Sequence, residues 1–331
     1  MEFRKIRIMH IKSGYIEGLA SGFFWAINGI IVGYLLSNKI MPITLQSVVF
    51  IGFFIAFFHD FFSSLTVYIT RMHGKNKLRK FNLKKHYALI LSGILAGPLG
   101  FTAYIQAIKY LGVGIATSTV AIYPVVITII SVLFFKKRLT KNILFSVLIT
   151  VVGCIGINIY SSSMSNEIIN IHRGVLFALI CVFSWSFESV VIERCCSTTD
   201  LDSDTMFFIR QCSSALLYLV IIICFFDVNI VFDFFVDYKY LSFIFMASIF
   251  ATISYLLWYK AIDKLGAPIG TVLNVTYSFW GVVLGAVLFS QYFDIYILFF
   301  LILIITGVIL SVMDKSSKNA VEGKSIKGSY L

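Results

Sequence analysis

The chain has 331 residues, of which 59% are hydrophobic and only 13% are charged. Soluble globular proteins carry roughly a quarter charged residues, so this composition excludes a chain that keeps its whole surface in water. The formal net charge of +11 would suit a nucleic-acid partner, and the positions of the cations decide whether such a partner is needed.

Ten runs of mainly apolar residues follow one another along the chain, each about the 20 residues that a helix needs to cross a bilayer. In chain order they are 15–36, 43–65, 87–110, 112–135, 142–161, 174–195, 204–226, 239–262, 267–289 and 294–313. Strands of a membrane barrel would show runs of about ten residues that alternate in polarity. The pattern therefore predicts an all-α integral membrane protein with ten transmembrane helices.

The cations gather on one side of these predicted spans. If the N-terminus is inside, the segments that face the cytoplasm hold 22 of the 27 lysines and arginines. Such a bias follows the positive-inside rule, so the net charge orients the chain in its lipid bilayer and calls for no nucleic acid. We expect a multi-pass protein of the cell (inner or plasma) membrane with both termini in the cytoplasm, and a disordered polar tail over 314–331.

The first half of the chain is similar to the second half. Residues 107–112 (AIKYLG) match 261–266 (AIDKLG) at an offset of 154, which also pairs Tyr123 with Tyr277. An earlier pair, Trp25 and Trp185, matches at an offset of 160. Five helices thus repeat as five, and because five is odd the second copy must be inverted. Inverted repeats typify secondary transporters, whose site lies near the midplane between the repeats. The predicted units are an N-terminal repeat over 1–161 and an inverted C-terminal repeat over 162–313.

Aromatic and polar side chains fall near the middle of several predicted spans. Those predicted to line a substrate site are Trp25, Asn28, Tyr123, Trp185, Glu188, Asn274 and Tyr277. Aromatic residues usually collect at the membrane interfaces, so a set at the midplane suits a lumen. For the aromatic residues alone, ordinary helix packing is an equally good explanation.

Glu188 is the most informative of these residues. A charge inside a transmembrane helix costs roughly 2.5–3.5 kcal/mol on insertion scales, so it normally faces a cavity or a partner. It could be the counter-ion of a cationic solute or a proton carrier, and the alternative is a structural pair with Arg210. Aromatic ring faces attract cations, above all quaternary ammonium groups. The hypothesis is therefore a cavity for a small organic cation.

His59 and Asp60 are further candidates for proton coupling, as is Glu188. They lie toward the end of the second predicted span, which favours a helix-end position over a proton relay. The motifs HExxH, GxSxG and the P-loop do not occur in the sequence, so we expect no enzyme activity, and no cofactor or metal is implied.

Several of these segments resemble a known family. In order and spacing, 107–112, 121–124 (AIYP), 135–139 (FKKRL), Trp185 and 261–266 resemble the drug/metabolite transporter (DMT) superfamily, in its EamA-like branch, over 15–313. The segments 59–61 (HDF), 96–100 (AGPLG), 184–189 (SWSFES) and 209–211 (IRQ) resemble bacterial choline importers of the LicB type. This resemblance implies that an aromatic cage and an acid hold choline. It reaches Trp25, Tyr123, Trp185 and Glu188 by motif position, whereas Tyr277 is assigned by internal symmetry.

The predicted function is secondary active transport of a small organic cation, with choline uptake driven by protons or another gradient through alternating access. The positions expected to permit bends are Gly97, Pro98, Gly112, Pro124, Gly266 and Pro268. One alternative is an EamA-type exporter of amino acids or other small metabolites. Another is a membrane scaffold or sensor that transports nothing.

Overall fold

Helices make up nearly all of the computed structural model, which describes residues 2–35, 47–72, 80–111, 113–134, 136–137, 139–162, 170–225, 238–289 and 294–313. The α-helices are α1 (Glu2–Leu35), α2 (Ser47–Val67), α3 (Leu83–Ile94), α4 (Thr102–Leu111), α5 (Val113–Val120), α6 (Tyr123–Leu133), α7 (Lys141–Ser162), α8 (Ile171–Thr198), α9 (Ser203–Phe225), α11 (Tyr238–Leu265), α12 (Ala267–Val275), α13 (Tyr277–Phe289) and α14 (Ile295–Met313). The expected tail over 314–331 and the hinge candidate Gly112 lie outside these ranges.

The prediction of ten transmembrane helices is confirmed: ten helical stretches in the described ranges are long and apolar enough to cross a membrane. The second stretch ends at Met72, beyond the expected end at residue 65. Within this extension the Thr70 hydroxyl donates to the carbonyl oxygen of Thr66 at 2.7 Å. A π-helical turn, Tyr68–Met72, completes this span.

Two spans are broken at positions that the repeat relates. The fourth span stops at a turn over residues 121–122, between α5 and α6, and the ninth stops at Thr276, between α12 and α13. Tyr123 and Tyr277 are the first residues after the two breaks and are the pair related by the offset of 154. The third span is continuous but passes through a π-helical stretch, Leu95–Phe101, that contains Pro98. A proline inside a helix removes a backbone donor, and wider turns absorb the loss.

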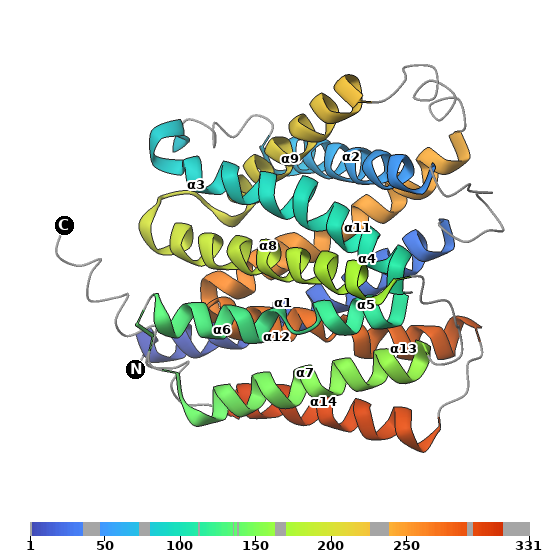
Figure 1. The fold of residues 1–331 in the computed structure, drawn as a ribbon. Helices are drawn as coiled ribbons and strands as arrows, with labels where there is room; N and C mark the ends of the chain where they lie inside the picture. Colours follow the sequence, from blue (N-terminus) through green and yellow to red (C-terminus); the bar gives the residue numbers. More distant parts are fainter. Residues whose placement is uncertain are drawn as a thin grey trace.

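The helices pack in pairs that follow the repeat. α1 packs along α11, α4 along α8, α2 along α9 and α7 along α14. Figure 1 shows α7 and α14 together along one edge of the bundle and α2 with α9 along the opposite edge. α8 and α1 lie between these edges, so both halves of the chain contribute to the middle of the molecule.

Small residues allow the outer pair to approach closely. Ser146 on α7 donates a hydrogen bond of 2.7 Å to the carbonyl oxygen of Gly307 on α14, across the two halves. The other face of α14 exposes large apolar side chains, among them Ile302, Ile305 and Ile309. Transmembrane helices associate through small residues and short polar contacts, and lipid covers the remaining apolar faces.

Candidate functional site

A cavity lies in the middle of the bundle, between helices of both halves. Its lining residues are Trp25, Tyr123, Trp185, Glu188, Ser254, Tyr255, Trp258, Asn274 and Tyr277. They come from α1, α6, α8, α11, α12 and α13. Both breaks in the spans border it, since Tyr123 and Tyr277 begin the helices that follow them.

Aromatic rings that meet edge to face form much of the cavity wall. The ring of Trp25 lies 6.4 Å from that of Trp185 and 5.4 Å from that of Tyr255, and both pairs are nearly perpendicular. The ring of Tyr123 lies 6.1 Å from Trp185 at an angle of 76°. Trp185 also donates its indole N–H to the carbonyl oxygen of Ala96 at 3.2 Å. Edge-to-face contacts and this hydrogen bond fix the rings in position before any solute arrives.

A chain of hydrogen bonds orients the amide of Asn274. The Tyr123 hydroxyl donates to Asn274 Oδ1 at 3.1 Å, and Asn274 Nδ2 donates to Ser21 Oγ at 3.0 Å. Ser21 in turn donates to the carbonyl oxygen of Gly18 at 2.7 Å. The chain joins α6, α12 and α1, and therefore ties the two broken spans to the first helix.

Glu188 is almost fully buried, with 1% of the residue exposed. Arg210 Nε lies 2.7 Å from Glu188 Oε1, and the Tyr259 hydroxyl donates to the same oxygen at 3.1 Å. Among the described residues, Glu188 Oε2 has no hydrogen-bond partner, and Glu188 lines the cavity. The guanidinium carbon of Arg210 also lies 5.0 Å from the ring centre of Tyr255. The structure thus pairs Arg210 with the carboxylate at the cavity.

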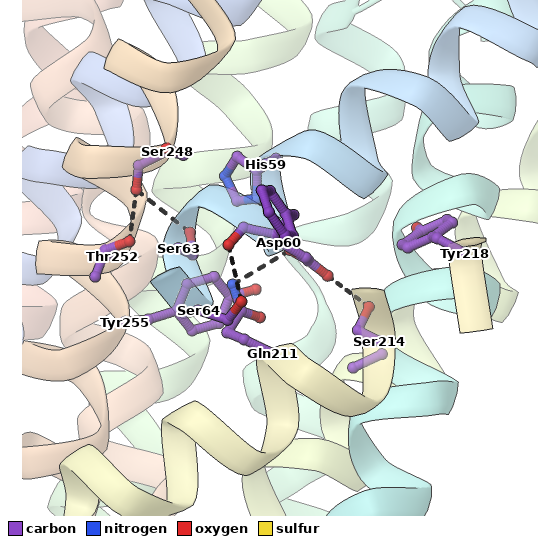
Figure 2. A network of polar contacts seen from close by, with 12 residues as sticks. His59, Asp60, Ser63, Ser64, Gln211, Ser214, Tyr218, Ser248, Thr252 and Tyr255 are labelled. Atoms are coloured by element: carbon purple, nitrogen blue, oxygen red, sulfur yellow. Dashed lines mark hydrogen bonds and ion pairs between the residues drawn. The ribbon is translucent and has the colours of Figure 1, made fainter. Parts of the chain in front are cut away.

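Asp60 belongs to the same polar network but does not line the cavity. It accepts hydrogen bonds from Ser214 Oγ at 2.5 Å, Gln211 Nε2 at 3.3 Å and Arg210 Nη1 at 3.4 Å. His59 Nδ1 lies 3.0 Å from Asp60 Oδ1. Figure 2 shows Ser214 and Gln211 reaching Asp60 from α9, with His59 on the other side.

The expected helix-end position of His59 and Asp60 is therefore wrong. Both residues are buried, with 3% and 5% exposed, because the second span continues to Met72 and brings them to its middle. Arg210 also donates to Gln211 Oε1, which adds a further link to the network. No group of three or more His, Cys, Asp or Glu in the described part of the chain is placed to hold a metal ion.

Six of the seven residues predicted to line a substrate site do line the cavity, and Asn28 does not. Asn28 is buried, and its Oδ1 has no hydrogen-bond partner among the residues described. Sequence reasoning missed Ser254, Tyr255 and Trp258 on α11. Their spacing was a usable signal, because positions i, i+1 and i+4 lie on one side of a helix.

A protein-family model, two relatives and a solved structure are similar to this chain. The model of the EamA-like transporter family matches residues 12–159 and again residues 172–313. The protein LicB of Haemophilus influenzae is 28% identical over 305 residues, which cover 92% of this chain and 99% of that protein. An uncharacterised transporter of Archaeoglobus fulgidus is 26% identical over 112 residues, 34% of this chain and 38% of that one. A solved crystal structure shares the fold, with a TM-score of 0.71 and 15% identity over 91% of this chain and 96% of the other.

Proposed function

Since the chain belongs to the EamA-like transporter family, we propose that it is a secondary active transporter of a small organic cation, with choline uptake as its activity. The resemblance to the DMT superfamily in the sequence is confirmed by the family match and by the relation to LicB. Transport is thus the activity of the family, and the substrate is the part that we propose.

The observation that carries the proposal is a buried carboxylate in a cavity of aromatic rings. A quaternary ammonium group cannot donate hydrogen bonds, so it is best held by aromatic rings and a nearby negative charge. Trp25, Trp185 and Tyr123 supply the rings, and Glu188 supplies the charge. The hydroxyl of choline would find polar partners in Asn274 and Ser254, which line the same cavity.

The four segments that resemble LicB-type choline importers come together in space. Segment 184–189 contributes Trp185 and Glu188, and 209–211 contributes Arg210, which binds Glu188. Segment 59–61 contributes Asp60, and 96–100 supplies the carbonyl of Ala96 that accepts from Trp185. Their convergence on one site supports choline over an unrelated solute of the same family.

Alternating access is the mechanism that we propose for this transport. We propose that the halves rock about the cavity, with the two breaks and Gly266 as bends. Gly266 has a φ of +86°, which suits glycine, and it joins α11 to α12. The driving force is a proton or other ion gradient across the cell membrane, with Glu188, His59 and Asp60 as the candidate proton carriers. In this arrangement both termini face the cytoplasm.

The test is uptake of labelled choline into proteoliposomes, with and without an inward proton gradient. We expect saturable uptake that falls at least tenfold in Glu188→Gln, because the variant keeps the shape of the side chain and loses its charge. Asp263→Asn is the matched control, since Asp263 is exposed and lies outside the cavity. It should transport like the parent protein.

The outcomes separate the rival functions. Uptake of amino acids or other metabolites that choline does not inhibit would indicate the exporter type of the same family. Binding of choline without accumulation in sealed vesicles would indicate a sensor. Neither result would alter the family.

A further inference from the structure

The proposed function leaves an electrostatic difficulty at the cavity. The carboxylate of Glu188, which should attract a cation, already forms an ion pair with Arg210, whose Nε lies 2.7 Å from Glu188 Oε1. An ion pair is neutral as a whole, and a solute cation would gain little from a neutral wall. The site therefore needs a further negative charge if the cation is to be attracted.

Asp60 supplies that charge. Its Oδ2 lies 3.4 Å from Arg210 Nη1, so one guanidinium is shared between two carboxylates on different helices. Ser214, Gln211 and His59 also direct polar atoms at Asp60. An ionised carboxylate is an acceptor only, and a shell of donors of this kind stabilises the ionised form.

The hydrogen-bond geometry around His59 fits a neutral imidazole better than a protonated one. Its Nε2 is buried and has no hydrogen-bond partner in the part of the chain that the structure describes. A neutral ring that donates from Nδ1 to Asp60 leaves only a lone pair at Nε2, whereas a protonated ring would leave a buried charged donor without an acceptor. The second case costs far more.

The other titratable neighbours of Asp60 are uncharged phenols. They are Tyr218 on α9 and Tyr255 on α11, which Figure 2 shows on either side of Asp60. Tyr259 on α11 contacts Glu188 rather than Asp60. The charged members of the network are thus Glu188, Arg210 and Asp60, which together carry one net negative charge.

We propose, on the basis of the function proposed above, that Asp60 is a positioning residue that sets the substrate class: by holding Arg210 it leaves Glu188 one uncompensated negative charge toward the cavity. The site then matches a solute with one net positive charge. It disfavours a neutral solute of the same shape and a zwitterion with the same ammonium group. Asp60 acts through Arg210, because it does not line the cavity itself.

Binding to the purified full-length protein tests the proposal, with choline, the neutral isostere 3,3-dimethylbutan-1-ol and the zwitterion glycine betaine as probes. Trp25, Trp185 and Trp258 line the cavity, so tryptophan fluorescence reports on its occupancy. We expect Asp60→Asn to weaken choline binding at least tenfold and to leave the weak binding of the isostere unchanged. A purely structural role would weaken both.

A charge-balanced double variant provides the decisive comparison. In D60N/R210Q the network again carries one negative charge, on Glu188 alone, so choline affinity should recover to within about threefold of the parent. Asp60→Glu keeps the charge and should retain most of the affinity even if the double variant does not fold. Ser64→Ala removes a hydroxyl that bonds the carbonyl of Phe61 and the side chain of Cys212 but none of the charged residues of the network, and it serves as the neutral control.

Three results would overturn the role of Asp60: D60N that binds choline like the parent, D60E that binds as weakly as D60N, or a folded double variant no better than D60N. Thermal unfolding of each variant shows whether it is folded. A folded parent protein that binds no organic cation would overturn the proposed function as well, and so the two failures are distinguishable.

Discussion

At the scale of single residues, Trp185 connects most of the cavity wall. Its ring contacts those of Trp25, Tyr104 and Tyr123, and its N–H is the donor to the carbonyl oxygen of Ala96. It therefore contributes both to the rigidity of the cavity and to the surface that meets the solute.

Trp185→Phe removes the indole N–H and shrinks the ring. The loss of the hydrogen bond to the carbonyl oxygen of Ala96 should cost about 1 kcal/mol of stability. Choline affinity should also fall severalfold, because Trp is the best cation-binding ring. The matched control is Trp280→Phe, because Trp280 does not line the cavity and its Nε1 has no partner among the residues described. Thermal unfolding measures the stability of both variants, and choline titration measures their affinity. Equal losses of stability and affinity in the two variants would contradict the role of Trp185 in the cavity wall.

Sequence reasoning reached some of these residues and not others for physical reasons. Trp25 and Trp185 were found because they occupy matching places in the two halves. Asn28 does not line the cavity, although it follows Trp25 by three residues on α1 and shares a helix face with it. Tyr255 and Trp258 were missed because an aromatic residue on an apolar helix faces lipid as readily as a lumen.

At the scale of helices, the apolar pattern located the spans but not the interruptions within them. Residues 112–135 and 267–289 read as continuous helices, and the structure breaks both near the middle. Apolar residues hide such breaks, because the turn residues, such as Ala121 and Thr276, differ little in hydropathy from helical ones. The repeat does place the two breaks at equivalent positions.

Gly97 shows how closely the helices approach at the polar network. A Cβ built on Gly97 would lie 1.8 Å from Ser214 Oγ and 3.3 Å from Asp60 Oδ2. Gly97→Ala should push Ser214 off Asp60, destabilise the protein by about 1–3 kcal/mol and weaken choline binding.

The control for that change is Gly29→Ala, because a Cβ on Gly29 would meet nothing within 4 Å. It should leave stability unchanged or raise it slightly, since alanine is the better helix former. Thermal unfolding with and without choline distinguishes the two variants. A Gly97→Ala protein as stable as the parent would show that α9 shifts to make room for the methyl group without a loss of stability.

At the scale of the whole molecule, different contacts join the two halves at the two ends of the bundle, although the positions involved are equivalent in the repeat. Glu17 on α1 binds Lys264 on α11, with Lys264 Nζ 2.6 and 2.7 Å from the carboxylate oxygens. The repeat offsets of 160 and 154 carry this pair onto Phe177 and Tyr110, whose rings stack at 5.9 Å. In the proposed orientation an ion pair closes the cytoplasmic end and an aromatic stack closes the other.

This asymmetry predicts that the ion pair of Glu17 and Lys264 sets the balance between the two states of the alternating-access cycle. Glu17→Gln should release α1 from α11 at the cytoplasmic end and favour the inward-open state. A partly buried pair contributes about 1 kcal/mol, which is about a fivefold change in a two-state population. The charge swap E17K/K264E should restore the original balance, because it re-forms the pair with the signs exchanged.

The measurement uses Ser254→Cys, which places a thiol in the cavity. A maleimide is applied from the cytoplasmic side, and the labelling rate is compared with that of the protein without this substitution. The rate should rise about fivefold in Glu17→Gln and return in the swap. Lys260→Met is the control, since it removes a lysine of the same helix for which the described residues show no ion pair. A swap that labels as fast as Glu17→Gln would mean that the shape of the two side chains, and not their attraction, holds this end closed.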